Sequence, residues 1–172
     1  MLKFLRAQYP SKVFMPALGV KTSTLHRWED CGYIYLGRPG TGKSVILTGE
    51  EILYAACLVV LSRVGGNSKF LLRGLRDCIS FFRGGLGEWH LKEYDAEGKP
   101  VYHEYPERMY AVFKYVERCG AVDAEWTLTD NPMEDTVHIT EAFGHKAAPY
   151  HQAIHLTELL RELVLKMDGR KV

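Results

Sequence analysis

The sequence predicts an α+β protein: a helical N-terminal domain with one short hairpin, followed by a small mixed α/β domain that ends in a long helix. Two observations lead to this prediction. Apolar residues recur at helical spacing through much of residues 11–83, and runs of large side chains alternate with turns after them. The glycine pair Gly84-Gly85 separates the two kinds of pattern.

The charge of the chain changes sign at the same place. Residues 1–85 contain 12 Lys and Arg against 5 Asp and Glu, a net charge of +7, and residues 86–172 contain 10 against 16, a net charge of −6. A basic half joined to an acidic half indicates that the first half meets a polyanion. We therefore expect two domains, residues 1–84 and residues 85–172.

The N-terminal domain is expected to begin with two short helices. Ser11 is a candidate N-cap for the first helix, and Gly19 supplies the turn after it. Thr22 or Ser23 is a candidate N-cap for the second helix, which extends to about Cys31. Short helices on either side of a glycine turn are typical of a helix-turn-helix.

A hairpin is predicted next, formed by two short β-type runs at Tyr33–Leu36 and Ser44–Leu47 around the turn-rich letters RPGTGK. Thr48 and Glu51 have the spacing of a capping box, which predicts that a new helix begins at about Gly49. That helix, ILYAACLVVLSRV, is apolar on nearly every side and is expected to be buried.

Helical spacing also predicts which side chains form the core of this domain. Leu25 and Trp28 lie three residues apart, which places them on one face of the second helix. Leu75, Ile79 and Phe82 recur in the same way on a later helix.

The stretch Gly37–Ser44, GRPGTGKS, also satisfies the pattern of a nucleotide-binding P-loop. A P-loop needs a helix that starts at the Lys43-Ser44 step, so that its N-terminus points at the phosphates. The capping box at Thr48 predicts a later helix start, and no apolar strand ending in an acidic residue follows. A small P-loop enzyme that uses Lys43 and Ser44 is therefore kept as the alternative interpretation.

The C-terminal domain is predicted from turn signals and periodicity. The letters WHLKEYD and KPVYHEY around Ala-Glu-Gly indicate a hairpin. A helix is expected from Pro106 to about Arg118, then strands at Ala124–Thr129 and Thr136–Thr140. A closing helix is expected from about Pro149 to Met167, whose leucines at 4-3-4 spacing indicate either core packing or a seam with a second subunit.

The sequence contains no recognised pattern for a metal site. The four cysteines have no CxxC spacing, and His151 and His155, one helical turn apart, lack the glutamate of a HExxH motif. No apolar run approaches the roughly 18 residues of a membrane span. We expect reduced structural thiols, no metal, no cofactor, no catalytic residues and a cytoplasmic location.

The stretch LGVKTSTLHRWE, residues 18–29, together with Gly32-Tyr-Ile34, the basic hairpin tip and the Thr48-Gly-Glu-Glu-Ile52 helix start, resembles the DNA-binding domain of the MerR family. The resemblance covers about residues 11–83. His26 and Arg27 depart from the arginine and the aromatic residue that the family usually has there. The resemblance implies a winged helix-turn-helix fold for this part of the chain.

The resemblance also implies roles for individual residues. Short hydroxyl and basic side chains at the start of the second helix would reach base edges or phosphates, and basic side chains on the hairpin would hold the flanking backbone. The expected DNA-binding residues are Lys21, Thr22, Ser23, Thr24, His26, Arg27, Arg38 and Lys43.

The function that follows is that of a non-enzymatic, sequence-specific DNA-binding transcriptional regulator from a bacterium, phage or mobile element. Its partners would be double-stranded DNA and a second copy of itself, with no membrane. The acidic half would dimerise or bind an effector or protein partner. Besides the P-loop enzyme, a winged helix that binds protein instead of DNA is a further alternative.

Overall fold

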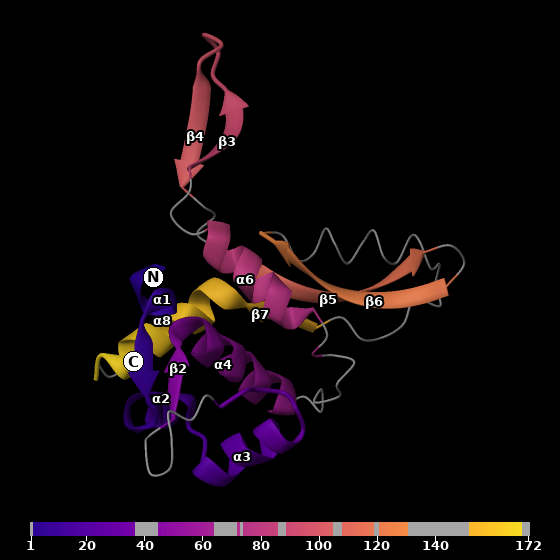
Figure 1. The fold of residues 1–172 in the computed structure, drawn as a ribbon. Helices are drawn as coiled ribbons and strands as arrows, with labels where there is room; N and C mark the ends of the chain where they lie inside the picture. Colours follow the sequence, from indigo (N-terminus) through magenta and orange to yellow (C-terminus); the bar gives the residue numbers. More distant parts are fainter. Residues whose placement is uncertain are drawn as a thin grey trace.

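The protein is described by a computed structural model that covers residues 2–36, 45–63, 72, 74–85, 89–104, 108–118, 121–130 and 152–169. In that part of the chain it is a mixed α+β fold with six helices and three small antiparallel sheets (Figure 1). The helices are α1 (Leu2–Arg6), α2 (Ser11–Leu18), α3 (Thr22–Asp30), α4 (Gly49–Arg63), α6 (Leu75–Gly85) and α8 (Leu156–Met167). The strands are β1 (Gln8–Pro10), β2 (Ile46–Thr48), β3 (Trp89–Tyr94), β4 (Pro100–Glu104), β5 (Tyr110–Arg118), β6 (Ala121–Thr129) and β7 (Gln152–His155).

Helices α2 and α3 are joined by a tight turn, as the sequence predicts. Gly19 adopts the left-handed conformation, with φ of 65° and ψ of 29°, and its N–H is directed to the carbonyl oxygens of Met15 and Pro16. A side chain disfavours this backbone conformation, so glycine is the residue that ends α2 here. The N-cap of α2 is Pro10, not Ser11, which is the first residue of the helix.

The first sheet differs from the predicted hairpin. Strand β2 pairs with β1, which precedes α2, with Tyr9 opposite Leu47 and Pro10 opposite Ile46. The segment Tyr33–Leu36 is not a strand, although Ile34 and Leu36 are buried. The prediction of a hairpin between residues 33–36 and 44–47 is therefore wrong, because β2 takes a partner from the start of the chain.

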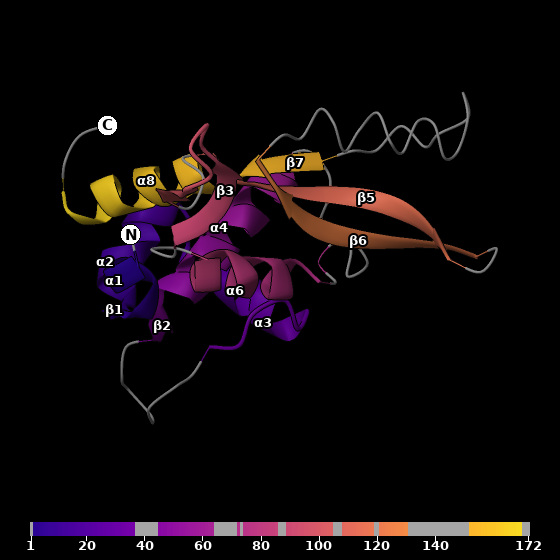
Figure 2. The ribbon, with the colours of Figure 1, turned by 90° about the horizontal axis from the view of Figure 1, so that it is seen from above.

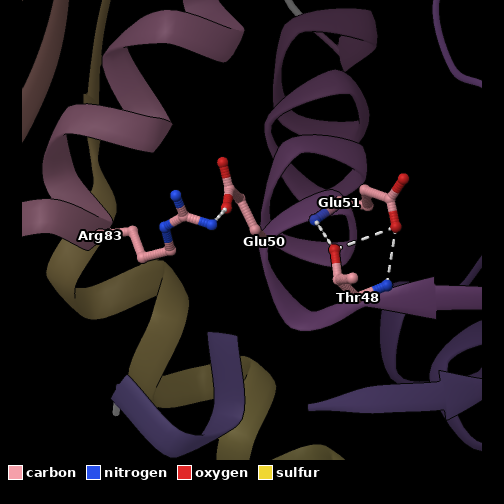
Figure 3. A network of polar contacts seen from close by, with 4 residues as sticks. All are labelled: Thr48, Glu50, Glu51 and Arg83. Atoms are coloured by element: carbon pink, nitrogen blue, oxygen red, sulfur yellow. Dashed lines mark hydrogen bonds and ion pairs between the residues drawn. The ribbon is translucent and has the colours of Figure 1, made fainter. Parts of the chain in front are cut away.

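The predicted capping box is present at the start of α4 (Figure 3). The backbone N–H of Thr48 donates to Glu51 Oε2 at 2.7 Å, and the backbone N–H of Glu51 donates to Thr48 Oγ1 at 3.2 Å. Between them, Gly49 begins the helix, and its N–H donates to the Ala7 carbonyl oxygen at 3.0 Å. A Cβ at Gly49 would clash with the Phe4 carbonyl group, so α1 can approach α4 only because this residue is glycine.

Helix α4 is the centre of the core, as its apolar sequence predicts. Its residues Ile52 to Leu58 are all buried, and α1, α2, α6 and α8 pack around it. Helix α6 faces it with Leu75, Ile79 and Phe82, which are all fully buried. At the surface, Arg83 Nη1 of α6 forms an ion pair with Glu50 Oε2 of α4 at 2.6 Å (Figure 3).

The second half of the chain contains a three-stranded antiparallel sheet in the order β6-β5-β7. The predicted helix from Pro106 to Arg118 is wrong, since Tyr110–Arg118 is strand β5. The prediction of a strand at Ala124–Thr129 is confirmed by β6. The strand expected at Thr136–Thr140 lies outside the described residues. The sheet packs against α6 through β5 and β6, with Phe113 and Trp126 in contact.

The closing helix is shorter than predicted, because Gln152–His155, which lies within its expected range, is strand β7. The helix α8 that follows packs against α2 and α4 (Figure 2). Its apolar seam lies inside the chain: Leu156 and Leu160 are fully buried, and Leu163 is 3% exposed. The structure therefore agrees with core packing, and not with a seam between two subunits, as the interpretation of these residues.

The predicted second hairpin is confirmed by β3 and β4, which pair antiparallel and extend away from the helices in Figure 1. Its turn is closed by Asp95, whose Oδ1 accepts the backbone N–H groups of Glu97 at 3.0 Å and Lys99 at 2.7 Å. Gly98 provides the positive φ, 79°, that this turn requires.

Candidate nucleic-acid interface

Helix α3 has one buried face and one exposed polar face. Leu25 and Trp28 are 1% and 2% exposed, which confirms both as core residues. Four of the predicted DNA-binding residues lie on its exposed side, and these are Lys21, Thr22, Ser23 and Arg27. Figure 1 places α3 at the edge of the fold, at the opposite end from the β3–β4 hairpin.

The N-cap of α3 lies one residue before the earlier of its two predicted positions, Thr22. Lys21 is the N-cap, in an extended conformation with φ of −90° and ψ of 156°, and no side chain caps the helix. The carbonyl oxygen of Lys21 accepts the Thr24 N–H at 2.9 Å. Thr22 and Ser23 therefore lie inside the first turn, and the prediction that one of them is the N-cap is wrong.

Thr24 and His26 are less exposed than the other four predicted DNA-binding residues of this segment. Thr24 is half-buried, and His26 Nδ1 lies 3.6 Å from Glu29 Oε2 on the same helix. An imidazole forms an ion pair with a carboxylate only when it is protonated. His26 therefore differs from an ordinary exposed residue of α3 in having the Glu29 carboxylate close to its side chain.

The C-terminal end of α3 is held by Arg76, a residue that the sequence did not single out. Gly32, with φ of 71°, ends the helix, and the Tyr33 N–H donates to the Trp28 carbonyl oxygen at 2.8 Å. Arg76 of α6 then donates to the Tyr33 carbonyl oxygen, and its guanidinium lies 4.4 Å from the ring centroid of Tyr54 on α4. Burial raises the pKa of Tyr54, and the nearby Arg76 partly opposes that shift.

Tyr35 is a second residue that the sequence reasoning missed. Its side chain is 76% exposed, whereas Ile34 and Leu36 on either side are buried. The letters IYL contain only large apolar and aromatic residues, so no sequence pattern marked Tyr35 as the exposed one of the three. The two buried neighbours hold its backbone close to the C-terminal end of α3.

The predicted wing residues Arg38 and Lys43 lie outside the described residues, as does the whole stretch Gly37–Ser44. The structure on its C-terminal side is described: β2 occupies Ile46–Thr48, and the next helix begins at Gly49. A P-loop requires a helix directly after its Lys-Ser step. The described chain after Ser44 has instead a strand followed by a capped helix, which is not the arrangement of a P-loop.

Two of the three thiols in the described part, those of Cys57 and Cys78, have the character of structural residues. Cys57 and Cys78 are buried, and burial raises the pKa of both, that of Cys78 to about 12. Thiols of this kind are protonated and poorly nucleophilic. The described residues include no group of three His, Cys, Asp or Glu side chains that would hold a metal ion. Nor does any described helix have the length and apolar character to cross a membrane.

Comparison with other proteins gives no assignment. No protein-family model matches the chain, and no curated protein matches it.

Proposed function

We propose that this chain is a sequence-specific DNA-binding protein with a MerR-like winged helix-turn-helix, and that it acts as a transcriptional regulator. Helix α3 would enter the major groove, and residues 37–44 would act as the wing on the flanking backbone. The observation that carries the proposal is the division of α3 into a buried apolar face and an exposed face with Lys21, Thr22, Ser23 and Arg27.

The N-terminus of α3 adds a second argument. Its first turn has no side-chain cap, and its N-cap residue is a lysine instead of one of the usual oxygen-bearing residues. Uncapped N–H groups beside a positive side chain form a favourable site for a phosphate group. A helix that served only the fold would gain stability from Ser, Thr, Asp or Asn at this position.

The charge of the chain agrees with this assignment, since the first half, which carries α3, has a net charge of +7. Phosphate contacts provide most of the non-specific affinity of a DNA-binding protein, and this affinity falls steeply with salt. We propose a homodimer as the binding unit. Because the α8 seam is buried in the chain, the dimer must use another surface.

The P-loop enzyme is the less favoured candidate. A P-loop needs a helix directly after its Lys-Ser step, and the chain that follows is a β-strand at Ile46–Thr48 and a helix that starts at Gly49, which favours the DNA-binding proposal. Its single supporting observation is the sequence pattern itself.

The test compares DNA affinity and ATP binding in the full-length protein. Selection from random duplexes identifies a site, and fluorescence anisotropy then measures affinity from about 50 to 200 mM salt. We expect Arg27→Ala and Lys43→Ala to weaken binding and to reduce the slope of log affinity against log salt by about one each. Arg161→Ala on α8 is the matched control and is expected to bind like the wild type. Wild-type protein that binds ATP and has no salt-dependent affinity for DNA would contradict the proposal.

A further inference from the structure

A cleft lies where α2, α4 and α8 meet, away from the α3 surface. Its volume is about 230 Å³. The floor is apolar, with the buried side chains of Leu18, Ala56 and Leu163, and Val59 lies beside them. An apolar cavity of about 150 Å³ is enough to bind a benzene ring. This cleft therefore has room for a ring and a short polar substituent.

The rim of the cleft carries three charged side chains, Arg63, Glu162 and Lys166. Lys166 Nζ and Glu162 Oε2 are 3.0 Å apart, so these two charges largely neutralise each other. Arg63 is exposed and has no carboxylate partner in the described part of the chain. It lies in the last turn of α4, where its full charge outweighs the partial charge of about −0.5 at a helix C-terminus. The rim is left with a net positive charge.

We propose that this cleft binds a small carboxylate with an apolar body of about the size of one aromatic ring. The body would lie on Leu18, Ala56 and Leu163, and the carboxylate would accept hydrogen bonds from the Arg63 guanidinium. Few precisely placed polar groups around an apolar pocket are the usual composition of a small-molecule site. Arginine suits a carboxylate because its planar fork can donate two parallel hydrogen bonds.

The position of the cleft suggests what such a ligand would do. Ala17 and Leu18 line it, and they directly precede the Gly19 turn that orients α3. A ligand that displaces the end of α2 would change the orientation of α3. This regulatory consequence rests on the proposed DNA-binding function, whereas the binding site itself does not.

The test uses three probes of similar shape and different charge: phenylacetate, phenylacetamide and 2-phenylethylamine. Titration into full-length protein with ¹³C-labelled methyl groups follows the resonances of Leu18, Val59 and Leu163. We expect saturable shifts at these methyl groups, with phenylacetate binding about three- to tenfold more tightly than the amide, and the amine more weakly than both.

Two variants test whether Arg63 causes the preference for the carboxylate probe. Arg63→Gln is expected to bind phenylacetate and phenylacetamide equally, while Arg161→Gln, which removes a charge elsewhere on the surface, keeps the wild-type ratio. Ala17→Leu fills the mouth of the cleft and is expected to weaken all three probes. Equal affinity for the acid and the amine, or no saturable shift with any probe, would overturn the proposal.

A separate measurement addresses regulation. DNA affinity is compared with and without saturating phenylacetate. A bound ligand that leaves DNA affinity unchanged refutes the coupling. Failure of the wild-type protein to bind any DNA refutes the proposed function and leaves the methyl titration as the test of the cleft.

Discussion

Arg76 of α6 donates a hydrogen bond from its Nη2 to the carbonyl oxygen of Tyr33, the residue through which the chain leaves α3, at 2.9 Å. The two residues are 43 positions apart in sequence. The same guanidinium packs over the Tyr54 ring of α4. One side chain therefore joins the end of α3 to two helices of the core.

Replacing Arg76 by methionine keeps an unbranched apolar stem and removes both the hydrogen bond and the cation–π contact. Because the hydrogen bond is exposed to solvent, we expect a loss of only about 1 kcal/mol in the free energy of unfolding. DNA affinity should fall further than this loss of stability explains, because the end of α3 is less constrained. Urea denaturation and anisotropy measure the two effects, with Arg161→Met as the control. Unchanged values of both would show that the Arg76–Tyr33 link is unimportant.

Lys21 provides a test in which stability and function change in opposite directions. Lys21→Asp gives α3 a side-chain cap and places a negative charge at its N-terminus, which should stabilise the protein by about 1 kcal/mol. The same change reverses a charge at the proposed phosphate contact and should strongly weaken DNA binding. Thermal unfolding and anisotropy give the two readouts. Lys21→Ser, which caps the helix without reversing the charge, should stabilise similarly and lose less affinity.

A variant that is more stable and still binds DNA like the wild type would remove Lys21 from the interface. A Lys21→Asp variant that is less stable than the wild type would show that the N–H groups in the first turn of α3 already have hydrogen-bond partners in solution. Lys99→Asp, in the turn of the β3–β4 hairpin, controls for the overall change in charge.

The capping box predicts coupled energies for Thr48 and Glu51. Each of the two side chains forms hydrogen bonds with the other residue. In one of these bonds, the Thr48 hydroxyl Oγ1 donates to Glu51 Oε2 at 2.9 Å. Thr48→Ala and Glu51→Ala should each cost about 1 kcal/mol, and the double variant should cost less than the sum. Glu51→Gln should cost least, since glutamine keeps the acceptor. Additive losses in a urea-denaturation cycle would contradict a reciprocal box.

The two buried thiols predict how stability depends on alkaline pH. Burial raises the pKa of Cys78 from 9.0 to about 12 and raises that of Cys57 as well. Below pH 9 both the folded and unfolded states keep these protons, so the thiols have no effect. Above it the unfolded state releases them first, and each thiol lowers the free energy of unfolding by about 1.4 kcal/mol per pH unit until the folded pKa is reached.

The measurement is a series of urea denaturation curves from about pH 8 to about pH 10.5. The double variant Cys57→Ala/Cys78→Ala is expected to start less stable, because it leaves small cavities, and then to lose stability less steeply than the wild type. Parallel curves for the two proteins would mean that the thiols do not contribute to this dependence.

The helix predicted at residues 106–118 shows where periodicity fails. Met109, Val112, Phe113 and Val116 have helical spacing, but the segment is strand β5. In its first half Ala111, Val112 and Phe113 are all buried, so this part of the strand is covered on both faces. A strand with two buried faces has a continuous apolar run and no alternation, and such a run cannot be distinguished from a helix by spacing alone.

Two local signals are present in the structure, the Gly19 turn and the Thr48–Glu51 capping box. The predicted N-caps are wrong, because Pro10 and Lys21 hold the positions expected for Ser11 and for Thr22 or Ser23. Burial of Leu25 and Trp28 followed from the period of a single helix. The partner of β2 and the contact between Arg76 and Tyr33 depend on segments distant in sequence, and no pattern within either segment carries that information. The division of α3 into a buried and an exposed face was thus predictable from α3 alone.

The pairing of β1 with β2 has a consequence for how this protein can change. Pro10 lies opposite Ile46, and the Ser11 N–H donates to the Val45 carbonyl oxygen at 2.8 Å. The chain between these two residues therefore begins and ends at neighbouring points, which backbone hydrogen bonds hold together. Helices α2 and α3 lie between them, and their apolar side chains Leu18, Leu25 and Trp28 belong to the core. The exposed residues of α3 can therefore change without changing the strand pair or the Thr48 cap of α4.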